Sequence, residues 1–274
     1  MTEAVRELSG AWNFRDVADG TPGLRPGRLF RSGELSRLDD VGRDTLRALG
    51  ITDVADLRAN QEVAKRGPGL VPDGIEIHRL PLPDLGDDEQ TEDDAPHETA
   101  FRRLFEGESD QSDEEVNEAA IRHMVDEYRQ FPTRNGAQRA VRQVFSMLAA
   151  GRSVLTHCFA GKDRTGFVIA TVLEVLDVDR DTIVADYLRS NAAVPQLREH
   201  IYEMIHKRSD VELTPEVVTF TKARLADGVL GVRPEYLDAA RQTIDAEFGS
   251  LNAYLREAGV TESEVDRLRA ELLS

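Results

Sequence analysis

The sequence predicts an α/β domain in which helices cover a mostly parallel sheet on both faces. Short apolar or β-branched segments alternate with helical patterns as far as Asp179, an order typical of parallel sheets. No convincing strand follows Asp179, so the last third of the chain is expected to be helical. The chain has 274 residues, 40% of them hydrophobic, which is enough to bury a sizeable core.

The expected elements follow from short apolar runs, helical periodicity and turn residues. Strands are expected at 28–31, 51–57, 75–80 and 153–157. Helices are expected at 41–49 (capped by Asp39 or Asp40 and closed by Gly50), at 61–66, 115–129 and 135–149, and from about Thr165 onward. In the helical last third, 228–259 is expected to be a helix pair divided at Gly249.

The composition argues against several classes of protein. The 34 basic and 51 acidic residues give a formal charge of −17, which disfavours binding to a nucleic-acid backbone. No window approaches the roughly 18 apolar residues of a membrane span. The single Cys rules out an internal disulfide and a cysteine-cluster metal site. Residues 1–25 lack a basic start followed by an apolar run, so no ordinary secretory signal is expected.

The negative charge is concentrated in one stretch, 84–118. This stretch holds 15 acidic residues and two arginines, a balance of −13, whereas the other 239 residues carry 36 acidic and 32 basic side chains, a balance of −4. We expect a solvated, mobile surface insertion with a short helical piece at 101–105, and a flap over a pocket is the sharper version of this expectation. The nearly neutral remainder can still hold an electropositive site for an anionic substrate.

The chemistry is expected in the segment 154–166, where a strand leads through a tight loop into a helix. Loop amides and a helix N-terminus together form a cradle for an anion. Gly161 lets the backbone approach a ligand closely, and Arg164 supplies a two-pronged donor for phosphate oxygens. Because the same groups stabilise a thiolate, we expect Cys158 to be ionised at neutral pH and nucleophilic.

Each of these residues also has a plainer interpretation. A lone Cys is normally a small buried hydrophobe, but that leaves Arg164 and Gly161 in this setting unexplained. His157 is expected to hydrogen-bond the loop or orient Cys158 rather than act as a base. Thr165 is expected to cap the helix, with donation to the thiolate as the alternative.

The segment HCFAGKDRTG, 157–166, resembles the signature of cysteine-dependent protein tyrosine phosphatases, in the form found in the bacterial tyrosine/serine phosphatase family. Further segments resemble the same family along nearly the whole chain, at 11–20, 24–38, 53–58, 126–140 and 185–191. The resemblance implies a single phosphatase domain over 1–274, with a phosphatase-type sheet and a helical lid at 228–259.

The implied reaction is hydrolysis of a phosphomonoester through a phosphocysteine. Cys158 attacks phosphorus, while the equatorial oxygens are held by Arg164 and the backbone amides of Phe159, Ala160, Gly161, Lys162, Asp163 and Arg164. No cofactor and no metal is expected. The leaving group needs a proton, and two carboxyls are candidates. The resemblance places that role on Asp163, whereas Asp84 follows a strand where many proteins of this fold carry their acid; Asp163 is favoured.

Lys162 adds a second cation beside the cradle, which a substrate with several phosphates could use; the alternative is a surface lysine without a role. The resemblance implies phosphoprotein or phosphoinositide substrates, covering phosphotyrosine and phosphoserine/threonine, with inorganic phosphate as product. It also implies a protein that is cytoplasmic or exported without a conventional signal peptide.

Asp16 and Arg58 could brace the loop, although structural salt bridges are the favoured role for both. Rival functions are a dedicated phosphoinositide or inositol phosphate phosphatase, sulfur transfer or arsenate reduction, and a non-enzymatic phosphate-binding module.

Overall fold

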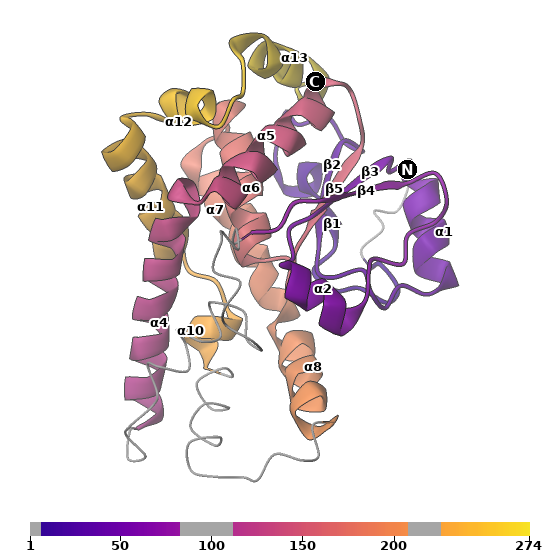
Figure 1. Cartoon of the computed structure of the whole chain (residues 1–274), viewed down its shortest axis with the longest axis vertical. Helices are drawn as coiled ribbons and strands as arrows, with labels where there is room; N and C mark the ends of the chain where they lie inside the picture. Colours follow the sequence, from indigo (N-terminus) through magenta and orange to yellow (C-terminus); the bar gives the residue numbers. More distant parts are fainter. Residues whose placement is uncertain (1–6, 83–111, 208–225) are drawn as a thin grey trace.

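A five-stranded sheet lies at the centre of the described part of the chain, with helices on both of its faces (Figure 1). The structure is a computed structural model that describes residues 7–82, 112–207 and 226–274. The strands are β1 (Arg15–Asp16), β2 (Leu29–Ser32), β3 (Asp53–Asp56), β4 (Glu76–Arg79) and β5 (Val154–His157). They run in the order β1-β2-β5-β3-β4, and all neighbours are parallel except β1 and β2.

The expected α/β architecture is therefore confirmed, and the four expected strands are all present in slightly different bounds. Strand β1 is the addition. It spans two residues at the sheet edge and pairs antiparallel with β2. A two-residue strand is too short to show a period of two, so sequence periodicity could not reveal it.

Side chains of successive strand residues point to opposite faces of the sheet, as the pleat requires. Leu29, Ala55 and Val154 belong to the larger hydrophobic cluster, which also takes in residues of α5, α6 and α11. Their neighbours in sequence, among them Phe30 and Leu155, belong to a second cluster with residues of α1. The sheet is thus buried on both sides, which accounts for the continuous apolar character of its parallel strands.

The helices cover both faces and extend beyond the sheet. They are α1 (Asp40–Ala48), α2 (Asn60–Arg66), α4 (Asp113–Gln130), α5 (Asn135–Ala149), α6 (Asp163–Val175), α7 (Arg180–Leu188), α8 (Val194–Lys207), α10 (Asp227–Leu230), α11 (Pro234–Thr243), α12 (Leu251–Glu257) and α13 (Glu262–Leu272). A π-helical turn, Ile244–Phe248, continues α11. No helix in the described ranges is long and apolar enough to span a bilayer.

Local signals set several helix ends. Asp39, rather than Asp40, caps α1 by accepting a hydrogen bond from the amide of Gly42 at 2.8 Å. Ser112 and Glu115 form a capping box at the start of α4. Gly249 has a φ of +78°, the left-handed conformation that ends a helix, and it separates the π turn from α12. The expected division of the helix pair at Gly249 is confirmed.

Of the last helices, α11 and α12 pack against helices of the core, whereas α10 packs between α4 and α8. Helix α11 packs against α4 and α6, and α12 packs against α5. Helix α10 lies between α4 and α8 and contacts both (Figure 1). Most of the acidic insertion, including Asp84 and the helical piece expected at 101–105, lies outside the described residues, while its end from Asp113 forms the start of α4.

Candidate active site

The loop that carries Cys158 follows β5, the middle strand of the sheet. His157 ends β5 and stands in register with Ser32 of β2 and Asp56 of β3. The loop therefore begins at the carboxyl end of the sheet, between two parallel neighbours, where open α/β sheets place their ligands. Helix α6 follows directly and begins at Asp163.

The helix start corrects one expectation. Lys162 occupies the cap position, so Thr165 lies inside the first turn and does not cap the helix. Its hydroxyl is buried and has no hydrogen-bond partner among the described residues. The first backbone amides of α6 remain directed toward the loop, as a helix N-terminus requires.

A cavity of about 170 Å³ opens above this loop. The residues of the expected cradle that line it are Cys158, Phe159, Ala160, Lys162, Asp163 and Arg164. Apolar side chains from α4, the turn after it, α8 and α10 form much of the remaining wall: Met124, Phe131, Leu197, Ile201 and Leu230. The cavity thus combines an anion-binding floor with apolar walls, which suits a phosphate attached to an aromatic ring.

Gly161 has a φ of +67° and lies against the end of β2. A Cβ at this position would come within 2.2 Å of the Ser32 carbonyl oxygen, so only glycine fits. Cys158 is 2% exposed at the cavity floor. Because it is the single thiol of the chain, any reaction of a thiol can be assigned to it without ambiguity.

His157 is fully buried and interacts with the loop backbone, as expected. Its Nδ1 lies 3.2 Å from the carbonyl oxygen of Cys158, and its Nε2 lies 3.6 Å from a carboxylate oxygen of Asp56. Burial lowers the pKa of His157 to about 4, although the Asp56 carboxylate acts in the opposite direction. The imidazole is therefore neutral at pH 7 and serves to hold the loop.

Arg164 is held by a carboxylate that the sequence analysis did not identify. Its Nη1 donates to Oε2 of Glu62 at 2.5 Å, and its Nη2 donates to Oε1 at 2.9 Å. Burial alone would lower the pKa of Arg164, but the paired Glu62 carboxylate raises it above its ordinary value. Such two-pronged pairs fix the plane of a guanidinium as well as its charge.

Helix α2 places Glu62 through its own N-terminus. Glu62 is the third helical residue, and its Oε2 accepts a hydrogen bond from the amide of Ala59 at 2.7 Å. The pattern of a carboxylate three residues after a helix start is visible in sequence. Its second partner, Arg164, is 102 residues away in the chain, and nothing local indicates it.

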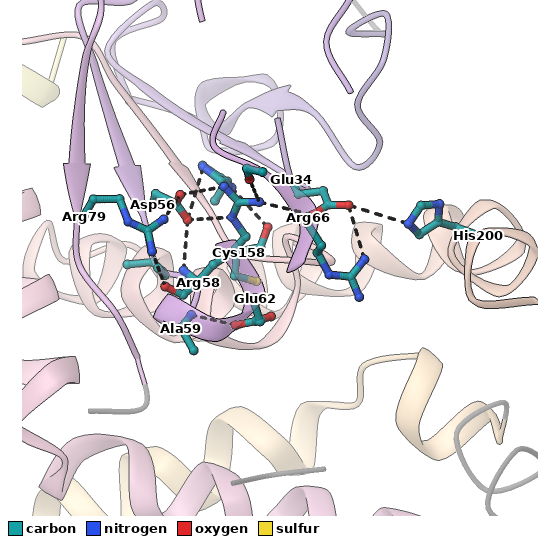
Figure 2. Close-up of polar contacts among 12 residues, drawn as sticks. Glu34, Asp56, Arg58, Ala59, Glu62, Arg66, Arg79, Cys158 and His200 are labelled. Atoms are coloured by element: carbon teal, nitrogen blue, oxygen red, sulfur yellow. Dashed lines mark hydrogen bonds and ion pairs between the residues drawn. The ribbon is translucent and has the colours of Figure 1, made fainter. Parts of the chain in front are cut away.

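A chain of ion pairs runs beside the loop from Arg79 through Asp56, Arg58 and Glu34 to Arg66 (Figure 2). Arg58 is completely buried and makes paired hydrogen bonds to Asp56 at 2.9 and 2.8 Å. Within the described ranges, neither Arg58 nor Asp16 hydrogen-bonds the Cys158 loop. The structural salt bridges expected for Arg58 are confirmed. Asp16 makes no ion pair among the described residues and instead accepts hydrogen bonds from the amides of Ala18 and Gly27, so its structural role is that of a backbone acceptor.

The two charged residues inside the loop pair with each other. Lys162 Nζ donates to the Asp163 carboxylate at 2.9 and 2.7 Å, and Tyr128 Oη donates to the same carboxylate at 3.0 Å. Burial and the nearby Asp163 charge raise the pKa of Tyr128 well above its ordinary value, which keeps its hydroxyl a donor. Asp163 is thus held in the cavity wall by the preceding Lys162 and by Tyr128 of α4.

Lys162 is not the surface lysine that the plainer interpretation expected. It is 6% exposed, and its ammonium also donates to the carbonyl oxygens of Val229 at 2.7 Å and Gly231 at 3.5 Å. In this arrangement, Lys162 connects the phosphate-loop segment to the end of α10.

One group of side chains in the described part of the chain could hold a metal ion: Asp53, Glu76 and His78. Asp53 and Glu76 are the first residues of β3 and β4, so the group lies at the opposite end of the sheet from the Cys158 loop. Asp53 already pairs with Arg152 at 3.2 Å. The group therefore cannot supply a metal to the cavity.

Comparison with known proteins agrees with this geometry. The sequence model of a family described as "Tyrosine phosphatase family" matches residues 6–274. The chain is 70% identical to the triple specificity protein phosphatase PtpB of Mycobacterium tuberculosis, over 98% of this chain and 99% of that protein. It is 31% identical to a Cupriavidus necator protein provisionally named as a tyrosine-protein phosphatase (96% and 86%), and 28% identical to a tyrosine-protein phosphatase of Nostoc commune (98% and 89%).

Proposed function

The chain belongs to the tyrosine phosphatase family and is a protein tyrosine phosphatase, and from this premise we propose that Cys158 is its nucleophile. The observation that carries the proposal is the position of Cys158 and Arg164 on one loop at the floor of one cavity. Family membership also favours phosphate ester hydrolysis over sulfur transfer, arsenate reduction or simple phosphate binding.

In the proposed reaction the Cys158 thiolate attacks phosphorus, a sulfur–phosphorus bond forms, and the ester P–O bond breaks on the opposite side. The departing oxygen takes a proton from a carboxylic acid. Water then attacks the phosphocysteine and releases inorganic phosphate and the thiolate. All of these steps use groups of this chain and water, so the proposal invokes no cofactor.

Arg164 is proposed to bind the equatorial oxygens together with the amides of 159–164. Glu62 takes one hydrogen from each terminal nitrogen of the guanidinium, and Nη1 also donates to the carbonyl oxygen of Leu82 at 3.1 Å. Among the described residues, Nε has no partner. The Nε–Nη2 edge therefore remains available as a two-pronged donor for phosphate.

For the general acid we propose Asp163, which lines the cavity and is held by Lys162 and Tyr128. Asp84 remains the alternative, because it lies outside the described residues and follows the end of β4 by five positions. Geometry supports the first candidate, and the pH dependence of the two variants separates them.

We further propose that the substrates include phosphoserine or phosphothreonine and phosphoinositides besides phosphotyrosine. A relative named for triple specificity supports this breadth. Cations also surround the cavity: Lys162 pairs with Asp163, Arg134 with Glu127 at 3.3 Å, and Arg66 with Glu34 at 3.6 Å. Additional phosphates of a substrate would compete with these carboxylates for the same cations.

We propose that the whole chain forms one domain. Within 228–259, the segment expected to be a lid, we propose that α10 at its start is the part that covers the cavity. Val229 and Leu230 of α10 line the cavity, whereas α11 and α12 pack in the core. Leu197 and Ile201 of α8 complete the cover from the other side.

Parallel assays on a phosphotyrosine peptide, a phosphoserine peptide and a soluble phosphoinositide test the proposed breadth. Lys162→Met is expected to reduce kcat/KM on the phosphoinositide at least roughly tenfold more than on the phosphotyrosine peptide. Lys65→Met, which removes an exposed lysine of α2, is the matched control and should not change that ratio. Equal losses on both substrates would contradict the assignment of Lys162 to a second phosphate.

A further inference from the structure

The loop that carries Cys158 is held from behind by two side chains that do not line the cavity. Asn13 Nδ2 donates to the carbonyl oxygens of Ala160 at 3.2 Å and Gly161 at 2.9 Å. Arg31 Nη2 donates to the same Gly161 oxygen at 2.9 Å. Since Asn13 and Arg31 are both absent from the cavity wall, these two carbonyls lie on the side of the loop away from the substrate.

Arg31 belongs to a buried cluster that consists of Arg15, Arg31, Asp186 and Ser190. The Asp186 carboxylate accepts two hydrogen bonds of 2.7 Å, one from Arg15 Nε to Oδ1 and one from Arg31 Nη1 to Oδ2. The hydroxyl oxygen of Ser190 accepts a further hydrogen bond from each arginine at 3.3 Å. Arg31 is completely buried, and Arg15 is 5% exposed. Two cations therefore share one carboxylate, which leaves one positive charge of the cluster unbalanced behind the loop.

The cluster is coupled to the loop through Asn13 as well. Arg15 Nη1 donates to Asn13 Oδ1 at 2.6 Å, which orients the amide so that Nδ2 faces the loop. Asn13 has a φ of +54°, a left-handed conformation that is uncommon outside glycine. Burial and the neighbouring Arg31 lower the pKa of Arg15 to about 10, so Arg15 still carries its charge at neutral pH.

We propose that Asn13 and Arg31 are positioning residues for the phosphatase reaction, because they hold the loop carbonyls away from the sulfur. In a trans peptide unit the C=O and the following N–H point in opposite directions. Fixing the carbonyls of Ala160 and Gly161 on the far side therefore turns the amide hydrogens of Gly161 and Lys162 toward the cavity. Those hydrogens stabilise both the Cys158 thiolate and a bound phosphate. The inference rests on the proposed function of Cys158.

Other charged or titratable groups line the same cavity or contact its loop. On the loop and its helix these are His157, Lys162, Asp163 and Arg164; from α2, Glu62 and Arg66; from α4, His123 and Glu127; and after α4, Arg134. None of them is changed in the variants below. A difference between variant and wild type therefore measures the effect of the Asn13 and Arg31 contacts with the loop carbonyls.

The test uses alkylation of Cys158, the single thiol of the chain, by iodoacetamide in Asn13→Gly and Arg31→Lys. Glycine accepts the positive φ of position 13, so Asn13→Gly removes the two loop hydrogen bonds without backbone strain. We expect the pH midpoint of alkylation to rise by about one pH unit in both variants. The concentration of inorganic phosphate that halves the alkylation rate should rise about tenfold.

Arg28→Lys is the matched control. Arg28 precedes the same strand at its opposite end, donates to the carbonyl oxygen of Gly151 at 2.6 Å and pairs with Glu271 at 3.1 Å. It thus makes the same kinds of interaction as Arg31 but far from the loop. We expect it to lower the melting temperature without moving the alkylation midpoint or the protection by phosphate.

Wild type provides the reference for the underlying function. If phosphate does not protect wild-type Cys158 from alkylation, the proposed function fails and the positioning role fails with it. If wild type is protected but Asn13→Gly keeps the wild-type midpoint and protection, only the positioning role is overturned. Should Arg31→Lys not fold, Asn13→Gly alone decides, and a fall in melting temperature without a change in either readout also overturns the proposal.

Discussion

Arg164 and Glu62 face each other through two parallel hydrogen bonds, although they belong to different helices and are 102 residues apart in the chain. Both side chains are almost completely buried, with 11% and 12% of their surfaces exposed. The pair fixes the guanidinium plane, and among the described residues the Arg164 Nε has no hydrogen-bond partner. Glu62 is in turn fixed by the amide of Ala59.

Glu62→Gln tests the importance of this pair. Glutamine keeps the size of the side chain but removes the charge, so Arg164 loses its fixed orientation while remaining buried. We expect kcat/KM for p-nitrophenyl phosphate to fall at least roughly tenfold, because an oxyanion donor is misplaced. Glu118→Gln, an exposed glutamate of α4, should stay within about twofold of wild type. Equal activity of both variants in steady-state assays would show that Arg164 does not depend on Glu62.

Cys158→Ser tests the nucleophile. A serine hydroxyl is not ionised near neutral pH, so turnover of p-nitrophenyl phosphate should fall by at least about a thousandfold. The loop amides and Arg164 are unchanged, and inorganic phosphate should therefore bind with an affinity within about threefold of wild type. Calorimetric titration with phosphate and the steady-state rate together check this expectation. Wild-type turnover in the variant would rule out Cys158 as nucleophile.

Asp163→Asn and Asp84→Asn separate the two candidates for the general acid. A general acid must be protonated to act, so its loss removes the fall of the rate at high pH and lowers the maximal rate by roughly 10²–10⁴-fold. We expect this change in Asp163→Asn, and a wild-type profile in Asp84→Asn. The measurement is the pH dependence of kcat with a substrate whose leaving group is poor. The opposite pattern would assign the role to Asp84.

His157→Gln tests the neutral, buried imidazole. Its pKa of about 4 in the folded state lies below the ordinary value of about 6.5, so the unfolded chain binds this proton first as pH falls. Wild type should therefore lose up to about 3 kcal/mol of unfolding free energy between pH 6.5 and pH 4 through this residue.

The variant should lack that part of the slope, whatever its stability at pH 7. Urea unfolding at several pH values in this window gives the two slopes directly. Identical slopes for wild type and His157→Gln would mean that the imidazole is protonated in the folded protein as well.

Site residues that are neighbours in the chain could be predicted from the sequence. The loop residues from Cys158 to Arg164 follow one another, so their spacing alone predicted that they would surround one ligand, and the structure places six of them around one cavity. Elements with strong local signals, such as helix α5 at Asn135–Ala149, also matched their expected bounds.

Residues that reach the loop from elsewhere in the chain could not be predicted in this way. Glu62, Asn13 and Arg31 meet the loop only because β2 and β3 flank β5 in the sheet, and strand order is a property of the whole fold. Each looks ordinary in sequence: a helix-start glutamate, a turn asparagine and a strand arginine. The prediction that Thr165 caps the helix was wrong for a related reason: its hydroxyl suits a cap, but the helix has already begun at Asp163.

The phosphocysteine is the central claim, and rapid quenching of wild-type enzyme during turnover of a phosphotyrosine peptide tests it most directly. Mass spectrometry of the digested protein should find one phosphoryl group on the peptide that contains Cys158, formed in a burst before steady state and absent from Cys158→Ser. A phosphoryl group on His157 or any other residue, or turnover with no phosphoenzyme at any quench time, would contradict the account.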